Sequence, residues 1–273
     1  MKHTSDTDPQ FFITHPQTCA YLPNRLERKI FTKLEPENGE FLNNTLSKQG
    51  FRRSQNILYR PACKGCTACF SSRIDVSKFQ KSKSQKRVVN KNRQVARSIK
   101  NPLATEEQYD LFKKYLNYRH IDGGMAGMEI DEFSAMIEET SIKSEVIEYY
   151  SNKLYSDPVL IGASLTDILD DGISMVYSFY DPEIKQNSFG KYIILDHIEY
   201  AKQLELPYVY LGYWVPNSEK MGYKSDFSGI EIFNDGAWRP LDIDCKLKLE
   251  PDQPEPITKQ VSNLKLPSNY LEI

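Results

Sequence analysis

The feature that most constrains this chain is a basic, cysteine-containing stretch at residues 51–92. Residues 51–100 contain 14 Lys or Arg and only one acid, so this window carries a net charge of +13. The whole chain carries −2, and the other residues therefore sum to −15. Such segregation of charge indicates a surface that holds a polyanion, rather than a feature that serves solubility. Three cysteines lie inside the stretch at two-residue spacing, and these are Cys63, Cys66 and Cys69.

The bulk composition is that of an ordinary globular protein. A chain of 273 residues with 40% hydrophobic and 26% charged residues can bury a full core, as one large or two modest domains. No apolar run approaches the roughly 20 residues of a membrane span, and the N-terminal MKHTSDTDPQ lacks the apolar segment of a signal peptide. Five cysteines, three of them crowded together, favour a reducing compartment. We therefore expect a cytoplasmic protein without a membrane partner.

The crowded cysteines are candidate metal ligands. Thiolates at this spacing can hold zinc or an iron–sulfur cluster, with a fourth ligand from the preceding segment. The predicted set is Cys19, Cys63, Cys66 and Cys69, and His15 is a possible substitute for the first of these. The alternative is that they are free thiols packed at a turn that Pro61 and Gly65 shape. Residues 54–61 and 70–79 alternate apolar and polar positions, which predicts paired strands on either side of this turn.

The remaining periodicity predicts a chain of mixed α and β structure. Apolar spacing predicts a short helix within residues 21–34, although prolines restrict its length. A change of composition at residues 101–102 predicts a boundary between a Cys-rich, basic domain (1–100) and a second domain (101–273). Thr105 is a good N-cap for a helix that ends near residue 120. Three strands follow, then a helix at 188–206 and a strongly β-prone run at 208–215, which together predict a crossover onto a sheet.

The lysine-rich run after the cysteines is the best candidate for a nucleic-acid contact. Phosphate contacts supply affinity without sequence choice, and Phe79 could offer a stacking ring. The alternative is a solvated helix face, which is the usual role of a charge run. The residues concerned are Lys83, Lys86, Arg87, Lys91 and Arg93.

Several motifs occur in order between about residues 19 and 227. They are GFRRS, YRPxCxxCxxC, SxRIDVxxFxxSKSQKR, SMVYSFYDPE, SFGKYxxL, and YVYLGYWV followed by KMGYKSDF. This combination resembles the arginyl-tRNA–protein transferase family, and most closely its bacterial branch, the aspartate/glutamate leucyltransferases. The resemblance implies an enzyme that transfers leucine from Leu-tRNA to the N-terminal amine of proteins that begin with Asp or Glu. Such a step marks the acceptor for N-degron proteolysis and needs no cofactor for its chemistry.

The same resemblance implies a fold class and a catalytic segment. The fold class is α+β, with a GNAT-like mixed-sheet acyltransferase domain behind an N-terminal Cys-knuckle, basic region. Backbone N–H groups of a splayed strand near residues 178–181 would stabilise the oxyanion. The general base would be Asp181 or Glu183, with Tyr180 orienting the reacting groups. The alternative is that the YDPE segment is simply a turn, since Asp-Pro commonly begins turns.

Two further groups of residues are candidates for substrate contacts. A guanidinium binds a carboxylate bidentately, so the acceptor's acidic residue calls for arginines. Arg52, Arg53 and Arg73 lie within the family motifs, although each could equally be a surface arginine that meets tRNA phosphates. In the KMGYKSDF motif, Lys220, Tyr223 and Lys224 are expected to hold the terminal ribose of the tRNA or merely to close the sheet.

Three other functions remain open at this point. The chain could be a Cys-knuckle RNA-binding module without catalysis, but its long β-rich C-terminal half argues against that. It could transfer arginine instead of leucine, because the physics of the sequence does not select the aminoacyl group. An acetyl-CoA-dependent acyltransferase is disfavoured, because no Q/RxxGxG/A pyrophosphate loop lies between residues 172–182 and the helix that follows.

Overall fold

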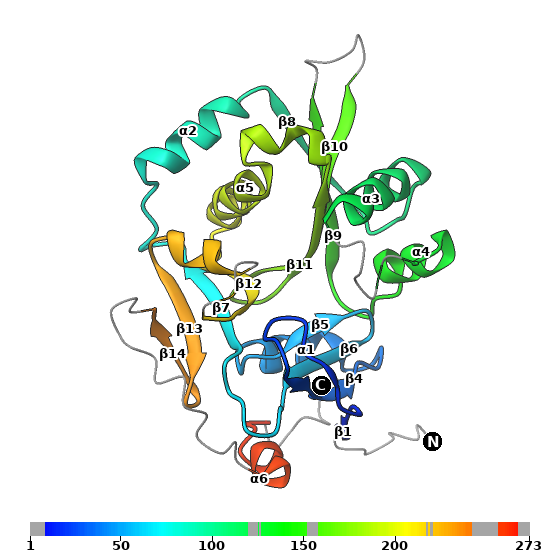
Figure 1. Cartoon of the computed structure of the whole chain (residues 1–273), viewed down its shortest axis with the longest axis vertical. Coiled ribbons are helices and arrows are strands. Elements are labelled where there is room, and N and C mark those ends of the chain that lie inside the picture. Colours follow the sequence, from blue (N-terminus) through cyan, green and yellow to red (C-terminus); the bar gives the residue numbers. More distant parts are fainter. Residues whose placement is uncertain are drawn as a thin grey trace. The chain divides into compact units, whose positions relative to one another are not determined.

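The structure is a computed structural model that describes residues 9–119, 125, 127–151, 158–216, 218, 221–241 and 256–266 (Figure 1). Its chain divides into two compact units. The first unit comprises Met1–Ser72, Tyr213–Asp226 and Glu231–Ile273, and the second comprises Arg73–Gly212 and Phe227–Ile230. A division into independent domains at residue 100 stays a prediction. No helix among the described residues is long and apolar enough to cross a membrane.

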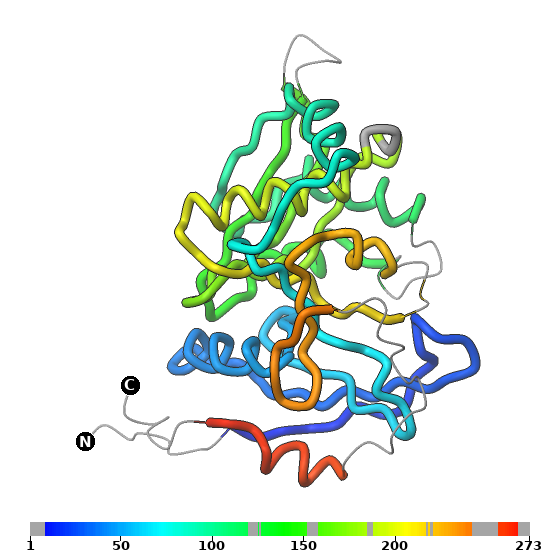
Figure 2. The backbone as a smooth tube through the Cα atoms, turned by 90° about the vertical axis from the view of Figure 1, so that its left-hand side faces the viewer, coloured from blue at the N-terminus to red at the C-terminus, as the bar shows by residue number. Residues whose placement is uncertain are grey.

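The first unit is built on a four-stranded antiparallel sheet. Its strands are β1 (Phe11–Ile13), β4 (Lys29–Lys33), β6 (Ile57–Pro61) and β5 (Arg52–Ser54), in that order across the sheet. The unit also contains two short hairpins and three helical segments. These are β2 (Gln17–Thr18) with β3 (Leu26–Glu27), β13 (Ile230–Asn234) with β14 (Ala237–Pro240), α1 (Gly39–Ser47), η2 (Gly222–Asp226) and α6 (Ile257–Ser262). The β13–β14 hairpin is orange in Figure 2.

The second unit is organised around a mixed sheet. Its strand order is β7 (Phe70–Asp75), β12 (Tyr208–Trp214), β11 (Gly172–Tyr180), β10 (Val159–Ile168), β9 (Ser144–Ser151) and β8 (Val95–Lys100). Strands β8 to β11 are antiparallel, whereas β11 and β12 are parallel. Helices α5 (Phe189–Gln203) and α2 (Lys83–Lys91) lie on one side of the sheet, and α3 (Glu106–Arg119) and α4 (Ile130–Glu138) on the other (Figure 1). The predicted α and β composition with a large mixed sheet is confirmed.

The strand–helix–strand unit at the centre of this sheet is also confirmed. The chain leaves β11, passes through the 3₁₀ segment η1 (Pro182–Asn187) and α5, and returns as β12 parallel to β11. Parallel neighbours need such a crossover, because a tight hairpin can join only antiparallel strands. Helix α5 presents an apolar face that includes Ile193, Ile194 and Ile198, and all three are buried.

Helices α3 and α4 close the other face of the sheet through an aromatic core. The rings of Phe112 and Phe133 lie 5.0 Å apart, and Phe179 of β11 meets Phe112 edge-on at 5.4 Å. Such geometry adds to the hydrophobic gain of burying these rings. The predicted start of α3 is confirmed: the Thr105 hydroxyl accepts from the Gln108 backbone N–H, and the Gln108 side chain accepts from the Thr105 N–H.

The helix predicted within residues 21–34 is wrong. The structure has strands β3 and β4 there, and burial along β4 alternates with a period of two. Ile30 and Thr32 are buried, while Lys33 between Thr32 and Leu34 is exposed. The apolar residues that indicated a helix are spread over β3, β4 and the residue after β4, and their spacing of three and four residues also fits these strands.

The strands on either side of the cysteine turn form, but they do not pair with each other. β6 pairs with β4 and β5, whereas β7 lies in the order of the other sheet. The predicted finger-like hairpin around the cysteines is therefore wrong for the described residues. Sequence alternation reports that a segment is a half-buried strand, but it carries no information about which strand is its neighbour.

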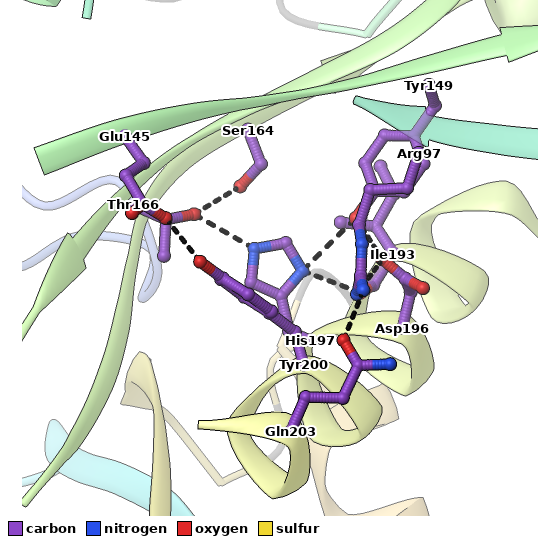
Figure 3. A network of polar contacts seen from close by, with 10 residues as sticks. All are labelled: Arg97, Glu145, Tyr149, Ser164, Thr166, Ile193, Asp196, His197, Tyr200 and Gln203. Atoms are coloured by element: carbon purple, nitrogen blue, oxygen red, sulfur yellow. Dashed lines mark hydrogen bonds and ion pairs between the residues drawn. The ribbon is translucent and has the colours of Figure 1, made fainter. Parts of the chain in front are cut away.

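A buried polar network fixes α5 against the sheet of the second unit (Figure 3). His197 is completely buried, and its Nδ1 lies 2.8 Å from the Ile193 carbonyl while its Nε2 lies 2.9 Å from the Thr166 hydroxyl. Burial lowers the pKa of His197 to about 4, so the ring is neutral, with Nδ1–H donating and Nε2 accepting. Beside it, Asp196 accepts from the Tyr149 hydroxyl at 3.0 Å and pairs with Arg97 at 3.3 Å.

Candidate functional site

The end of β11 carries the three predicted catalytic residues, and the structure brings them together. Asp181 follows the strand directly, and its backbone N–H donates to the Ile161 carbonyl of β10. Its Oδ1 accepts the backbone N–H of Glu183 at 2.9 Å, which is the hydrogen bond of an Asx turn. The YDPE segment is therefore a turn, as the alternative reading had it. A turn and a functional site are compatible, because the turn leaves the second carboxylate oxygen of Asp181 available to other groups.

That second oxygen is paired with a lysine from α3. Lys114 Nζ lies 3.0 Å from Asp181 Oδ2 and 3.3 Å from Glu183 Oε2. Desolvation acts to lower the pKa of Lys114, but the hydrogen bonds to Asp181 and Glu183 outweigh it and hold that pKa above its ordinary value. Asp181 is mostly buried, whereas the Glu183 side chain is 78% exposed. Of the two carboxylates, Asp181 is thus the one that the fold holds in a defined position.

Tyr180 is held by α3 and by the first turn of α5. Its hydroxyl accepts a hydrogen bond from Arg119 Nη2 at 2.9 Å, and its ring packs on Tyr115 at 5.1 Å and on Phe189 at 5.9 Å. A Cβ at Gly190 would lie 3.3 Å from the Tyr180 hydroxyl, so the small residue makes room for the phenol. The phenol is buried and oriented, which fits the positioning role that the sequence predicts for it.

The parallel pairing between β11 and β12 is short. It joins Gly172, Ile173 and Ser174 to Tyr208, Val209 and Tyr210, while β11 continues for six residues to Tyr180. On its other edge β11 stays paired with β10 as far as Tyr180, and the register shifts between Leu165 and Thr166. β11 and β12 pair over only three residues and diverge after Ser174 and Tyr210. Tyr180 and Asp181 lie at the end of β11, beyond the point where the two strands separate.

The three arginines expected to bind the acceptor are buried. Arg53 Nη1 donates to the Gln55 carbonyl at 2.8 Å. The guanidinium of Arg73 lies 3.4 Å from the centroid of the Tyr208 ring, and it donates to the Tyr210 hydroxyl at 3.3 Å. Arg52 is likewise buried, in β5. An acceptor role for Arg52, Arg53 and Arg73 stays a prediction, but Arg53 and Arg73 already serve contacts within their own unit.

The KMGYKSDF segment places a lysine amine in the interior of the first unit. Lys224 Nζ is buried and donates to the Tyr213 carbonyl. Desolvation, assisted by the nearby Arg52 charge, lowers the pKa of Lys224 to about 7. Tyr223 beside it is exposed, and Lys220 lies outside the described residues. Contacts from these residues to tRNA stay predictions, and the burial of Lys224 makes a direct phosphate contact by that amine unfavourable.

The basic run folds as the amphipathic helix α2. Ser82 caps it through a capping box with Gln85, whose side chain is buried. The cations lie on the opposite side and are all exposed: Lys83, Lys86, Arg87 and Lys91, followed by Arg93. Among the salt bridges of the described residues, none involves these five side chains. An uncompensated row of cations attracts a polyanion, and screening by salt weakens that attraction.

The four cysteines gather beside the β2–β3 hairpin, but they do not form a metal site as placed. Burial, and then the neighbouring thiols of Cys63, Cys66 and Cys19, raise the pKa of Cys69 to about 12. Burial likewise raises the pKa of Cys63. No three His, Cys, Asp or Glu side chains of the described chain are arranged to hold a metal ion. Metal ligation by the cysteines therefore stays a prediction, and no chemistry is derived from it.

Two cations of α3 escape the sequence analysis. Lys114 and Arg119 contact the predicted catalytic segment, yet they lie in no recognised motif. In the sequence they are two of several charged residues on an ordinary helix. The sequence offers one signal for them: Lys114, Tyr115 and Arg119 all fall in the helix that begins after the N-cap Thr105. That signal cannot say which strand end the helix will meet.

Comparison with known proteins gives a consistent picture. Sequence models for the N terminus and the C terminus of arginine-tRNA-protein transferases match residues 17–87 and 107–234. A protein of Ruegeria pomeroyi named aspartate/glutamate leucyltransferase is 55% identical over 272 residues, covering 99% of this chain and 98% of that protein. A protein of the same name from Dinoroseobacter shibae is 53% identical over 275 residues, covering 98% and 96%.

Among solved structures the likeness is weaker. The crystal structure of FemX aligns with a TM-score of 0.44 at 9% identity, covering 75% of this chain and 71% of that one. The structure of L-PGS from Bacillus licheniformis aligns with a TM-score of 0.42 at 9% identity, over 54% and 46% of the two chains. At such values neither alignment carries an argument about this chain.

The buried Lys224 amine makes a prediction about stability. Its folded pKa lies below the value of about 10.4 in an unfolded chain, so the unfolded state binds more protons between these two values. The free energy of unfolding therefore rises with pH from about 7 upward, by at most about 5 kcal/mol over the whole interval. Lys224→Met removes this dependence, and we expect the variant to be more stable than the wild type at pH 7.

Urea unfolding at pH 7, 8 and 9 measures both proteins. The stability advantage of Lys224→Met should shrink as the pH rises, and Lys143→Met, at an exposed lysine, serves as the matched control. Parallel curves for the wild type and Lys224→Met would show that the amine is charged in the folded protein at neutral pH.

Proposed function

Because this chain belongs to the arginine-tRNA-protein transferase family, we propose that it transfers leucine from Leu-tRNA to the N-terminal amine of proteins beginning with Asp or Glu. The observation that carries this proposal is the 55% identity to an aspartate/glutamate leucyltransferase over 99% of the chain. The transferred leucine would then mark the acceptor for N-degron proteolysis. Arginyl transfer is the alternative, and a test with both charged tRNAs separates the two.

The proposed reaction asks little of acid–base groups. An amine attacks an ester that is already activated, and the leaving group is the ribose hydroxyl of the tRNA. An α-amino group has a pKa of about 7.7–8, so about a tenth of it is neutral near pH 7. Most of the acceleration can then come from positioning and from stabilisation of the tetrahedral oxyanion. Such chemistry suits a chain whose candidate site holds carboxylates, a phenol and backbone N–H groups.

The acyl-transfer centre is proposed to lie at the diverging end of β11. A GNAT-like arrangement would use backbone N–H groups near Ser178–Asp181 as the oxyanion donors, apart from the Asp181 N–H, which already donates to the Ile161 carbonyl. The short β11–β12 pairing supports this, because a strand edge without a neighbour has N–H groups available to a ligand. Asp181 would accept the ammonium proton, directly or through water, and Tyr180 would orient the reacting groups. The anchored Asp181 is favoured over Glu183, whose side chain is largely in solvent.

The tRNA is proposed to lie along α2. The cations of α2 are exposed, and they take part in none of the salt bridges found among the described residues. The other side of the helix contacts α5, which holds it in place. Each phosphate neutralised by a lysine or arginine releases counterions, which gives affinity that depends on salt. The proposal assigns affinity to α2, while the choice of leucine would fall to a pocket for the aminoacyl side chain.

The transfer itself is the first prediction of this proposal. Incubation with tRNA charged with labelled leucine should label peptides that start with Asp or Glu and leave peptides that start with Ala or Arg unlabelled. Parallel reactions with tRNA charged with labelled arginine provide the control for the aminoacyl group. Transfer of arginine but not leucine would change the assigned donor. Binding of charged tRNA without any transfer would indicate an RNA-binding module instead.

The role of α2 predicts a change in salt dependence. The triple variant Lys83→Ala, Lys86→Ala, Arg87→Ala should bind Leu-tRNA more weakly, and the slope of log K against log salt should flatten by about 2, near one unit or less per lost phosphate contact. The matched control removes the same charges from exposed positions elsewhere: Lys33→Ala, Lys143→Ala and Arg239→Ala. An unchanged slope in the α2 variant, measured by filter binding, would remove this helix from the interface.

The role of Asp181 predicts a loss of turnover without a loss of tRNA affinity. Asp181→Asn keeps an acceptor for the Glu183 N–H but cannot take a proton, so kcat should fall about 10²-fold, the low end of the range for loss of a general base. Glu183→Gln should lose far less. Lys114→Met separates two explanations for such a result: Asp181 acts as the base, or Asp181 only holds Lys114 in position. If it lowered kcat as much as Asp181→Asn does, the carboxylate would be serving to position Lys114 and not as the base.

A further inference from the structure

A small pocket opens in the first unit beside the cysteine turn, and the site described above does not use it. It has a volume of about 380 Å³ and lies between the β2–β3 hairpin and residues 64–66. Its walls are formed mainly by Asn24, Arg25, Leu26, Arg28, Lys64 and Cys66. The size suits one amino-acid side chain and part of the backbone next to it.

The pocket is positively charged. Three of its lining side chains are cations, and none of its described lining residues is an Asp or Glu. The nearest carboxylate in the hairpin, Glu27, is paired with Lys29 at 2.9 Å. Three like charges around one cavity repel each other unless an anion lies between them. The pocket therefore favours an anionic ligand.

The cations are held in place by backbone hydrogen bonds to the cysteine turn. The Arg28 carbonyl accepts the Ala62 N–H at 2.8 Å, and the Arg28 N–H lies 3.4 Å from the Cys63 sulfur. The hairpin loop is closed by the Cys19 N–H, which donates to the Arg25 carbonyl at 2.9 Å. These bonds fix the points from which Arg25 and Arg28 extend, so the pocket is largely formed before any ligand enters.

Arg28 provides a second, independent indication of a ligand. Its Nε is buried and has no hydrogen-bond partner among the described residues. A buried donor without an acceptor carries a desolvation penalty, which an oxygen in the pocket would remove once the Arg28 side chain rotates to bring Nε to it. A guanidinium that offers Nε together with a terminal nitrogen is also the arrangement that binds a carboxylate bidentately.

We propose that this pocket binds the side-chain carboxylate of the acceptor's N-terminal Asp or Glu. The inference rests on the proposed leucyl transfer, which requires that an acidic residue be recognised. The arginines that the sequence offered for this task are buried, and two of them already serve contacts within their own unit: Arg53 and Arg73. Arg25, Arg28 and Lys64 instead line an open cavity, where Arg25 Nη1 makes only a long, exposed contact of 3.5 Å to the Gly65 carbonyl.

The shape of the pocket favours a carboxylate over an RNA phosphate. A phosphate backbone is bound by cations spread along a row, as in α2. Here the cations surround a single cavity that Leu26 and Cys66 also line, and Leu26 is 62% exposed. An apolar residue at the rim suits the peptide that follows an acidic side chain. The pocket would also reject Asn and Gln, because a neutral amide leaves the cations without a counter-charge.

The test compares acidic acceptors with their amide isosteres. Peptides that start with Asp, Glu, Asn or Gln are assayed with saturating Leu-tRNA in the wild type, Arg25→Met and Lys64→Met. Both substituted residues are exposed, so folding should be unaffected. Each variant should raise KM for the Asp peptide about tenfold and lower the Asp/Asn ratio of kcat/KM by about the same factor. The affinity for Leu-tRNA should not change.

Two further variants make the comparison specific. Arg28→Lys keeps the charge but loses the planar pair of donors, so it should also lower the Asp/Asn ratio. Lys33→Met removes an exposed lysine from β4, away from the pocket lining, and should leave the ratio as it is. A ratio that is unchanged in all three pocket variants would overturn the inference. So would weaker Leu-tRNA binding with an intact ratio, because the pocket would then contact RNA.

Calorimetric titration without tRNA separates this inference from the function on which it rests. A wild type that binds the Asp peptide more tightly than the Asn peptide, with a preference lost in Lys64→Met, supports the pocket even if no leucine is transferred. In that case the proposed function would fail alone. Transfer restricted to acidic peptides, with the preference retained in Arg25→Met, Lys64→Met and Arg28→Lys, would refute the pocket and keep the function.

Discussion

The burial of polar groups between α5 and the sheet is the constraint on which the second unit depends. A helix that brings His197 and Asp196 against strands must find partners for them, because an unpaired polar group in that interior costs more than its hydrogen bond returns. Thr166, Tyr149 and Arg97 provide those partners from three different strands. The geometry of α5 is thereby fixed along its length, and its first turn is fixed against Tyr180 through Phe189. The helix that this network holds in place is thus the one that packs against Tyr180 in the candidate acyl-transfer centre.

The basic window of the sequence serves two different purposes once it is folded. Its first part enters β5, β6 and the cysteine turn, where Arg52 and Arg53 are buried and Lys64 lines a pocket. Its second part forms α2, whose cations are exposed in a row. Net charge along the chain indicated a polyanion, but it could not distinguish cations that meet solvent from cations that are enclosed. That distinction arises only when strands and helices assign each side chain to a face.

Signals between residues close in sequence predicted much of the fold, whereas contacts between residues far apart in sequence could not be predicted. Thr105 and Gln108 define the start of α3 through hydrogen bonds between residues three positions apart, and this spacing can be recognised in the sequence. The crossover through α5 follows from its apolar face and the β-prone run behind it. The helix expected at residues 21–34 failed because Ile30, Phe31 and Leu34 have spacings that fit two periods. At the candidate site, the YDPE segment was found by resemblance, whereas Lys114 could not be found, since its contact with Asp181 joins positions 67 residues apart.

The two proposed substrates make opposite demands on cations, and the folded chain contains both kinds. A tRNA must be bound tightly by many weak, solvent-exposed contacts, which salt screens over about 8 Å at physiological ionic strength. An acidic side chain offers a single charge, so its selection requires donors that enclose that charge. Such donors lose binding free energy when a neutral residue takes the place of the acidic one. Row-like cations on α2 suit the first demand, and the convergent cations around Arg28 suit the second. A chain that supplied only one kind would explain either donor binding or acceptor choice, but not both.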